Sequence, residues 1–165
     1  MEGLAVFTLF ALVQLWQTRD ALEGQAPPLT ARLLNGDPYE IADNRFTLVY
    51  FWASWCPVCR LTSGNIDALA KQHSVITVAM QSGDAARVAN HLKDQALDFP
   101  TIADPQGSIA REWGVKGVPT IYGVDKQGRI RFVSLGYTTS LGLKCRLWWA
   151  EHSDAIFQEY PSKPQ

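Results

Sequence analysis

The chain has 165 residues, with 15 Lys and Arg against 16 Asp and Glu and a formal net charge of −1. A nucleic-acid-binding domain usually gathers its Lys and Arg residues into a stripe. The basic residues are scattered here, so we expect no nucleic-acid partner. Hydrophobic residues make up 47% of the sequence, which is too apolar for a disordered chain and sufficient for a packed core. The length predicts one domain.

The N-terminal residues are strongly apolar. The stretch from Gly3 to Trp16 (GLAVFTLFALVQLW) carries no charge, and we predict an apolar anchor helix over residues 1–17. As a helix it would extend about 21 Å, less than the roughly 30 Å hydrocarbon core of a bilayer. No basic segment precedes it, as one does in a signal peptide. Three interpretations stay open: a start that has lost the front of a transmembrane anchor, a short interfacial helix, or a helix packed on the domain.

A linker and then a folded domain are predicted after the anchor. Residues 18–28 (TRDALEGQAPP) combine charge, Gly and a Pro pair, which is typical of a linker. The folded domain is predicted over residues 29–165. Near its start, between Leu29 and Ile41, the turn sequence Asn-Gly-Asp-Pro separates two short apolar stretches, and this pattern predicts an antiparallel hairpin.

Two buried strands alternate with two helices in the middle of the sequence. Residues 46–52 (FTLVYFW) and 75–80 (VITVAM) are apolar runs typical of fully buried strands. Residues 57–72 and 84–95 have helical patterns. The alternation indicates an α/β fold with a parallel central pair of strands. In the first helix, the residues expected on the inward face are Leu61, Ile66, Leu69 and Ala70.

The remaining elements complete a mixed sheet. A short helix is predicted over residues 106–113, and Gly117-Val118-Pro119-Thr120 opens a strand that continues to Val124. The turn sequence Asp-Lys-Gln-Gly then leads into a hairpin partner over residues 129–135. A C-terminal helix is predicted over residues 139–160.

The most informative pattern is Trp55-Cys56-Pro57-Val58-Cys59, between a predicted buried strand and a predicted helix. Two Cys residues at this spacing can close a disulfide ring without unwinding the helix. A thiolate at a helix N-terminus lies near unpaired N–H groups and the positive end of the helix dipole, which lowers its pKa below the free value of about 8.5. We therefore expect Cys56 to be the exposed attacking thiol and Cys59 the buried resolving thiol. Pro57 suits the first turn because its missing N–H would be unpaired there.

A zinc site and a purely structural disulfide are two other uses of a cysteine pair. Half of a zinc site would need a second pair or nearby His ligands, and Cys145, His73, His91 and His152 have no ligand spacing. A purely structural disulfide would not need so reactive a position. We therefore expect no metal and no cofactor beyond a redox-active disulfide between Cys56 and Cys59. Cys145, which lies among apolar neighbours, is expected to be a buried filler.

Two further features accompany the pair. If the Val118–Pro119 bond is cis, the backbone of Val118 would be turned outward and free to pair with an extended substrate beside Cys56. A trans proline at the start of an edge strand is the alternative. Trp55 precedes Cys56 directly, and two interpretations of it stay open: it shapes the entrance to the thiol or it packs beneath the thiol.

Three stretches of the sequence together carry a family resemblance. FWASWCPVCR, VAMQSGD and DPQGSIAREWGVKGVPTIYGVDKQGRI resemble the TlpA/ResA group of thioredoxin-like, membrane-anchored periplasmic disulfide oxidoreductases. The Cys-Pro-Val-Cys centre and GYTTSLGLKCRLWWA look most like the suppressor-of-copper-sensitivity protein D branch of that group. The resemblance covers about residues 25–150. It implies a thioredoxin fold, with a central mixed sheet flanked by helices and an N-terminal β-hairpin.

The resemblance also implies roles for particular residues. Cys56 matches the nucleophile, Cys59 the resolving cysteine and Pro119 the cis-proline. Asp84 stands roughly where related proteins hold a carboxylate near the active site, so the resemblance implies a proton acceptor at this position. Asp84 is also an obvious N-cap for its helix, and we favour the capping role. Related haem-maturation thioredoxins commonly have an acidic residue after the cis-proline, where Thr120 stands here. A role in cytochrome c maturation is therefore not expected.

These observations predict an enzyme that exchanges the Cys56–Cys59 dithiol with disulfides of protein substrates. The resemblance implies a periplasmic domain tethered to the inner membrane, acting as a reductase that a membrane electron donor keeps reduced. The residues expected to support substrate binding are Trp55, Pro57, Val58, Val118 and Pro119. The alternative is a copper-handling protein that uses the same pair as soft thiolate ligands for Cu(I).

Overall fold

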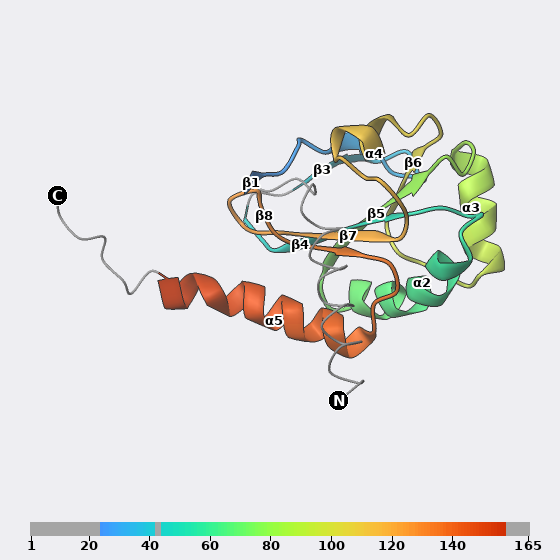
Figure 1. Cartoon of the computed structure of the whole chain (residues 1–165). Coiled ribbons are helices and arrows are strands. Elements are labelled where there is room, and N and C mark those ends of the chain that lie inside the picture. The colour runs from blue at the N-terminus through green and yellow to red at the C-terminus, as the bar shows by residue number, and fades with distance from the viewer. Residues whose placement is uncertain (1–23, 42–43, 158–165) are drawn as a thin grey trace.

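The computed structural model describes residues 24–41 and 44–157. The predicted anchor helix over residues 1–17 lies outside the described residues. A six-stranded mixed sheet forms the middle layer, in the strand order β1-β8-β7-β4-β5-β6 (Figure 1). Its strands in chain order are β1 (Gly24–Gln25), β4 (Thr47–Trp52), β5 (Ser74–Met80), β6 (Thr101–Asp104), β7 (Thr120–Val124) and β8 (Arg129–Leu135).

Strand β4 lies inside the sheet and is buried along its whole length. It pairs in parallel with β5 and antiparallel with β7, so the predicted parallel central pair is confirmed. Leu48 and Tyr50 belong to the core on one face of the sheet, and Val49 and Phe51 to the core on the other. Because strand side chains alternate between faces, an uninterrupted apolar run is what a strand covered on both faces requires.

Helices cover both faces of the sheet (Figure 1). α2 (Pro57–Ala70), α3 (Ala85–Asp94) and α5 (Ser140–Phe157) contribute side chains to the core around Tyr50, while α4 (Ser108–Glu112) contributes to the core around Phe51. This is the mixed sheet flanked by helices that the resemblance implies. Among the described residues, no helix combines the length and apolar composition needed to cross a membrane.

A separate two-stranded antiparallel sheet precedes β4. It consists of β2 (Thr30–Arg32) and β3 (Pro38–Glu40), in the segment where the turn sequence predicts a hairpin. The amide side chain of Asn35 stabilises the turn by accepting from the backbone N–H of Asp37 at 3.1 Å. Leu29, just before the hairpin, is buried in the same core as Phe51.

Two short strands differ from the sequence-based expectation. β1 pairs with β8, although it lies within the segment predicted as a linker, and β6 extends the sheet from the edge of β5, where no strand was expected. β1 is held by backbone pairing, and Ala26 adds a hydrogen bond from its N–H to the carbonyl of Gly128 at 2.8 Å. Backbone pairing of this kind leaves no signal in side-chain composition.

The inward face of α2 also differs from the expectation. Leu61 was expected to face the core, but 69% of it is exposed. The buried residues of the helix are Cys59, Thr62, Ser63, Ile66 and Leu69. Two of these buried residues, Thr62 and Ser63, carry hydroxyl groups. A prediction based on hydrophobicity alone therefore chose the wrong inward face for the first two turns of α2. Ile66 and Leu69 face inward as predicted.

Candidate active site

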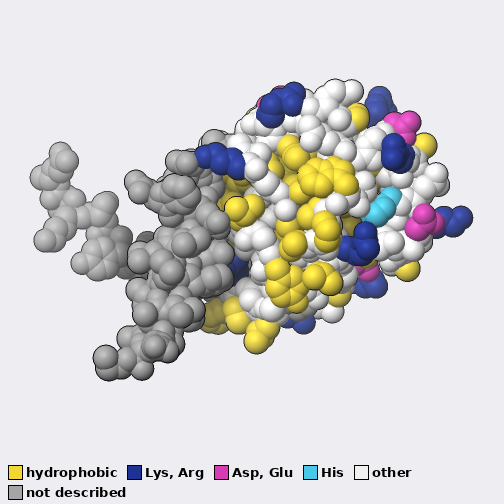
Figure 2. Space-filling view, turned by 45° about the vertical axis from the view of Figure 1, so that its right-hand side comes forward, with side chains coloured by type: hydrophobic (Ala, Val, Ile, Leu, Met, Phe, Trp, Pro, Cys, Tyr) yellow, Lys and Arg dark blue, Asp and Glu magenta, His cyan; other side chains and the backbone are white. Residues whose placement is uncertain are grey.

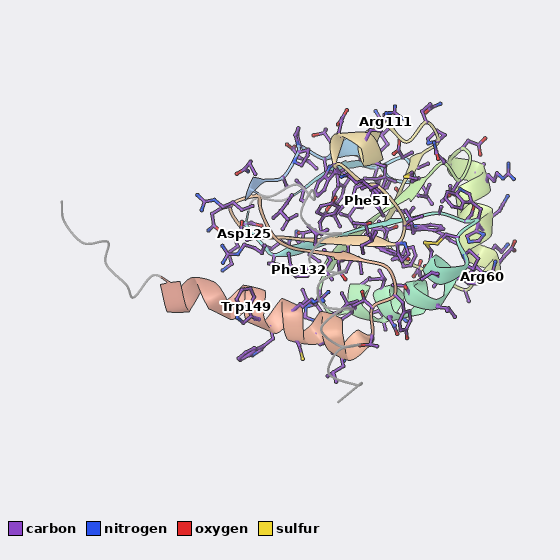
Figure 3. All side chains as sticks on the ribbon, in the orientation of Figure 1. Phe51, Arg60, Arg111, Asp125, Phe132 and Trp149 are labelled. Atoms are coloured by element: carbon purple, nitrogen blue, oxygen red, sulfur yellow. A yellow bond between two sulfur atoms is a disulfide. The ribbon has the colours of Figure 1, made fainter. Side chains whose placement is uncertain are left out.

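Cys56 and Cys59 form a disulfide where β4 passes into α2, shown as a yellow bond in Figure 3. Their Cα atoms are 5.3 Å apart. The exposed fraction is 6% for Cys56 and 1% for Cys59. Cys59 is therefore buried as expected, whereas the expectation of an exposed Cys56 is wrong. Cys56 is the more accessible of the two, but both belong to the core that includes Tyr50.

The sulfur of Cys56 is the N-cap of α2. The backbone N–H of Cys59 donates to Sγ of Cys56 at 3.1 Å, and Cys56 has extended backbone angles of φ −91° and ψ 111° while Pro57 begins the helix. A capping side chain normally uses oxygen to satisfy an unpaired N–H of the first turn. Here a sulfur occupies that position, so a negative charge on Cys56 would gain both the hydrogen bond and the helix dipole.

The loop before β7 faces this sulfur. The Val118–Pro119 peptide bond is cis, which confirms the prediction, and the carbonyl oxygen of Val118 lies 3.6 Å from Sγ of Cys56. The hydroxyl of Thr120 donates to the carbonyl of Gly117 at 2.6 Å and so closes the turn around the proline. Residues 62 positions apart in the sequence thus meet at the redox centre.

Trp55 lies beside the cysteine pair with 58% of its surface exposed. Its indole N–H donates to the carbonyl of Gln81 at 3.1 Å, so the interpretation that Trp55 packs beneath the thiol is wrong. Gln81 has a φ of 48°, in the left-handed region that few residues other than glycine adopt. Its N–H donates to the carbonyl of Asp104 at 2.9 Å. The loop after β5 therefore fixes the orientation of Trp55.

The same loop also contacts the backbone before Trp55. The hydroxyl of Ser82 accepts from the N–H of Ser54 at 2.9 Å and donates to the carbonyl of Met80 at 3.0 Å. Ser82 is buried. The segment that carries the cysteine pair is thus attached to the end of β5 through both Ser54 and Trp55.

Asp84 caps α3. Its carboxylate accepts from the N–H of Arg87 at 2.9 Å, and the residue is exposed. This is the capping role that the sequence also indicated. A role for Asp84 as a proton acceptor stays a prediction. Of the other expected supporting residues, Val58 is exposed, Val118 is half-buried and Pro119 is buried.

Two buried hydroxyl groups near Cys59 were not singled out from the sequence. The hydroxyl of Tyr50 donates to the carbonyl of Cys59 at 3.3 Å and lies 3.3 Å from the hydroxyl of Ser63. Ser63 donates to the same carbonyl at 2.8 Å. Burial raises the pKa of Tyr50, and the hydrogen bond with Ser63 opposes this effect. The alternation along β4 indicates the face on which Tyr50 lies but not its partner.

The third cysteine, Cys145, is not part of the disulfide. Cys145 is free and exposed, so the expectation of a buried filler is wrong. Leu143 and Leu147 are the buried residues of this part of α5, and Cys145 lies between them on the opposite side of the helix. Within residues 24–41 and 44–157, no group of three or more His, Cys, Asp and Glu residues is placed to hold a metal ion.

Cys56 caps α2, is bonded to Cys59 one turn into that helix, and faces the cis-proline loop at the end of two neighbouring strands, β4 and β7. This is the arrangement of a thioredoxin-like protein. Comparison with protein families agrees: the Redoxin profile matches residues 22–141. The chain belongs to the Redoxin family and is a thioredoxin-like oxidoreductase.

Individual relatives extend the comparison. The chain is 35% identical over 157 residues to a thioredoxin-like protein of Haemophilus influenzae, covering 91% of this chain and 93% of the relative. It is 28% identical over 146 residues to the thiol:disulfide interchange protein DsbE of Pseudomonas aeruginosa, covering 88% and 73%.

Solved structures share the fold. StoA from Bacillus subtilis superposes with a TM-score of 0.62 at 23% identity, covering 73% of this chain and 96% of StoA. A thiol:disulfide interchange protein of the thioredoxin family from Chlorobium tepidum superposes with a TM-score of 0.67 at 21% identity, covering 79% and 98%.

Proposed function

We propose that this protein exchanges the Cys56–Cys59 dithiol with disulfides of other proteins and acts as a reductase. The observation that carries the proposed exchange is the capping hydrogen bond from the N–H of Cys59 to Sγ of Cys56 at 3.1 Å, whereas the direction as a reductase rests on the family resemblance. It makes the two sulfurs unequal, because only Cys56 combines the cap position with the larger exposed fraction.

The reaction proceeds in two displacements. The thiolate of Cys56 attacks one sulfur of the partner's disulfide, forms a mixed disulfide and releases the partner's other sulfur as a thiolate. The thiolate of Cys59 then attacks Sγ of Cys56, which forms the Cys56–Cys59 disulfide and releases the second partner thiolate. Two electrons pass to the partner, and the two protons of the dithiol end on the partner's thiols.

The groups around the two cysteines support different steps of this reaction. The N–H of Cys59 stabilises charge on Cys56 in the free dithiol. Because Cys59 is 1% exposed, its sulfur reaches Cys56 from the protein side while the partner occupies the solvent side. The backbone of Val118, 3.6 Å from Sγ of Cys56, supplies a polar edge to which an extended partner segment can bind.

The direct test compares insulin reduction by the wild-type protein and by Cys56→Ser, with dithiothreitol as the electron source. The proposal expects Cys56→Ser to retain only the background rate of the reagent. Cys145→Ser is the matched control because it also removes one thiol, and it is expected to keep the wild-type rate. Wild-type activity in Cys56→Ser would refute the proposal.

The direction of electron flow is tested by the reduction potential of the Cys56–Cys59 couple against glutathione. A reductase is expected near the thioredoxin value of about −270 mV, whereas a value near −120 mV would identify an oxidant. A membrane electron donor that returns two electrons to the disulfide is part of this proposal, and it rests on the resemblance to membrane-anchored disulfide oxidoreductases.

The proposed location is the periplasm, with residues 1–17 as the anchor in the cytoplasmic membrane. The uncharged stretch from Gly3 to Trp16 and the family resemblance support it. A reporter enzyme that is active only outside the cytoplasm, fused after Gln165, is expected to be active. Activity only from a cytoplasmic reporter at the same position would refute this location.

The copper-handling alternative uses the reduced pair as two soft ligands for Cu(I). The resemblance to the suppressor-of-copper-sensitivity protein D branch motivates this alternative. The copper-handling function stays a prediction. The test is Cu(I) binding by the reduced protein. Tight, stoichiometric binding that is lost in Cys59→Ser and is not accompanied by disulfide exchange would support copper handling and refute the proposed reductase activity.

A further inference from the structure

Large hydrophobic side chains are exposed around the redox centre. We use the name docking surface for five of them: Trp55, Val58, Leu61, Tyr137 and Leu141. Leu61 and Leu141 are 69% and 72% exposed. Single exposed hydrophobic residues are normal on protein surfaces, whereas a contiguous group marks a site of interaction. Figure 2 shows hydrophobic side chains gathered on the face turned forward, with both basic and acidic side chains towards its right-hand margin.

Contacts between α2 and the start of α5 make the group contiguous. Val58, Leu61 and Asn65 lie along one side of α2, because residues three, four and seven positions apart share a helix face. The side-chain amide of Asn65 donates to the carbonyl of Thr138 at 3.3 Å. Tyr137 directly precedes Thr138, and Leu141 lies in the first turn of α5. The exposed stripe therefore runs from the cysteine pair along α2 to α5.

The charged residues that stand nearest to Leu61 and Leu141 along the chain are basic. Within four residues of Leu61 on either side, Arg60 is the one charged residue, and within four residues of Leu141 it is Lys144. Both are exposed. The acidic residue of α2, Asp67, lies nine positions from Val58 and so on the opposite side of the helix, where it pairs with Lys71 at 3.3 Å. The two leucines of the docking surface thus have exposed basic residues as their nearest charged neighbours along the chain.

The position of Cys56 requires close approach by whatever reacts with it. Cys56 is 6% exposed, whereas its near neighbours in the sequence, Trp55 and Val58, are 58% and 40% exposed. A partner that brings a sulfur to Sγ of Cys56 therefore approaches beside these two side chains. A partner segment that continues along α2 then covers Leu61 as well.

We propose that the docking surface binds a partner polypeptide that presents its cysteines within an apolar segment flanked by acidic residues. This inference rests on the proposed disulfide exchange and narrows its substrate class. The apolar side chains cover Leu61 and Leu141, and the acidic flanks lie against Arg60 and Lys144. Partial removal of two leucines from water on binding, less the cost of ordering the partner, is expected to change the rate of exchange by about tenfold.

The test uses two synthetic peptides with the same internal disulfide ring, one flanked by Leu and Glu and the other by Ser and Lys. Bis(2-hydroxyethyl) disulfide serves as a small, neutral probe of the chemistry alone. Each rate is divided by the rate with the small probe, so that effects on folding or thiol reactivity cancel. The variants are Leu61→Ser combined with Leu141→Ser and, as matched control, Trp149→Ser. Trp149 is also an exposed hydrophobic residue of α5 but lies outside the docking surface.

The inference expects the normalised kcat/KM of the wild-type protein to favour the Leu and Glu peptide. The Leu61→Ser/Leu141→Ser variant is expected to lose about tenfold of that preference, while Trp149→Ser keeps it. Added salt weakens the preference, because the acidic flanks interact with exposed cations.

Three results would overturn the inference. The first is equal normalised rates for both peptides with the wild-type protein, with the small disulfide still reduced. The second is a preference that persists in the double variant. The third is binding to phosphatidylglycerol vesicles that the double variant loses without any change in peptide preference, which would assign the surface to a membrane. Failure of the wild-type protein to reduce any of the three disulfides would instead refute the proposed function.

Discussion

The N–H of Cys59 donates to Sγ of Cys56 across 3.1 Å, so the reactive sulfur is itself the cap of α2. The covalent bond and the hydrogen bond join the same two residues. When the disulfide is reduced, the hydrogen bond remains available to stabilise a thiolate on Cys56. The sulfur of Cys59 has no corresponding position at the helix end, because it lies in the first turn beneath the surface.

The accessibility of Cys145 predicts a simple thiol count. In the oxidised native protein, Cys145 is free and exposed while the other two cysteines are joined. We expect Ellman's reagent to titrate one thiol without denaturant, and all three cysteines of the sequence after reduction and unfolding. Cys145→Ser should remove the native signal. A native signal that appears only after unfolding would contradict the exposed position of Cys145.

Replacing Tyr50 by Phe tests the buried hydroxyl groups beneath Cys59. Tyr50 and Ser63 both donate to the carbonyl of Cys59, so Tyr50→Phe leaves this carbonyl with a hydroxyl partner. We expect the free energy of unfolding of the oxidised protein, measured in urea, to fall by about 1 kcal/mol.

The double variant Tyr50→Phe/Ser63→Ala removes both hydroxyl donors. It is expected to lose more than the sum of the single variants, since the two hydroxyl groups share one acceptor. Strictly additive losses would show that the two hydroxyl groups act independently.

Asp104 is expected to be important for stability near the loop that holds Trp55. Its buried carboxylate accepts from the N–H groups of Ser108 and Ala110 at 2.8 and 3.0 Å, and Gly107, the N-cap of α4, provides no side-chain cap. Asp104→Ala should lower the free energy of unfolding by about 1–3 kcal/mol. Asp94→Ala, at an exposed position of α3, is the control and should change it by less than about 0.5 kcal/mol.

The stability of the fold should decrease at alkaline pH. Burial raises the pKa of Tyr122 from 10.0 to about 12, and the hydroxyl donates to the carbonyl of Trp113 at 2.7 Å. Below pH 10 this contribution to stability is fully present. Above pH 10 the unfolded state loses the proton first, so stability declines as the pH rises towards the folded pKa of about 12.

Urea midpoints measured across this pH range check the effect of Tyr122. Tyr122→Phe should make the decline shallower, although buried Tyr50 retains its own contribution, since its pKa is also raised. Tyr137→Phe, at an exposed position, should leave the slope unchanged. An unchanged slope in Tyr122→Phe would contradict the burial of this hydroxyl.

Much of the fold follows from hydrophobic pattern. The runs that include Tyr50 and Val78 are strands covered on both faces, and such strands need no polar alternation. α3 begins immediately after Asp84, as its capping residue predicts. β1 and β6 could not be predicted from the hydrophobic pattern, because strands of two to four residues that pair through their backbones carry no periodic signal.

The reactive residues of the candidate site could be predicted from the sequence, but their burial and the hydrogen bonds around them could not. The spacing of Cys56 and Cys59 and the position of Pro119 identified the residues that meet. The burial of Cys56, the exposure of Leu61 and the hydrogen bond from Trp55 to Gln81 depend on how α2 is rotated against the sheet. In that rotation Thr62 and Ser63 are buried, and a hydrophobic pattern does not predict the burial of polar residues.

The most direct measurement of the central claim is the trapping of a mixed disulfide with a protein substrate. Reduced Cys59→Ser, mixed with insulin, should accumulate a covalent adduct through Cys56, visible on a non-reducing gel and located by peptide mass spectrometry. Reduced Cys56→Ser should form no such adduct; both variants also carry Cys145→Ser, so that no other thiol reacts. An adduct that forms through Cys59, or equally in both variants, would contradict the assignment of Cys56 as the attacking sulfur.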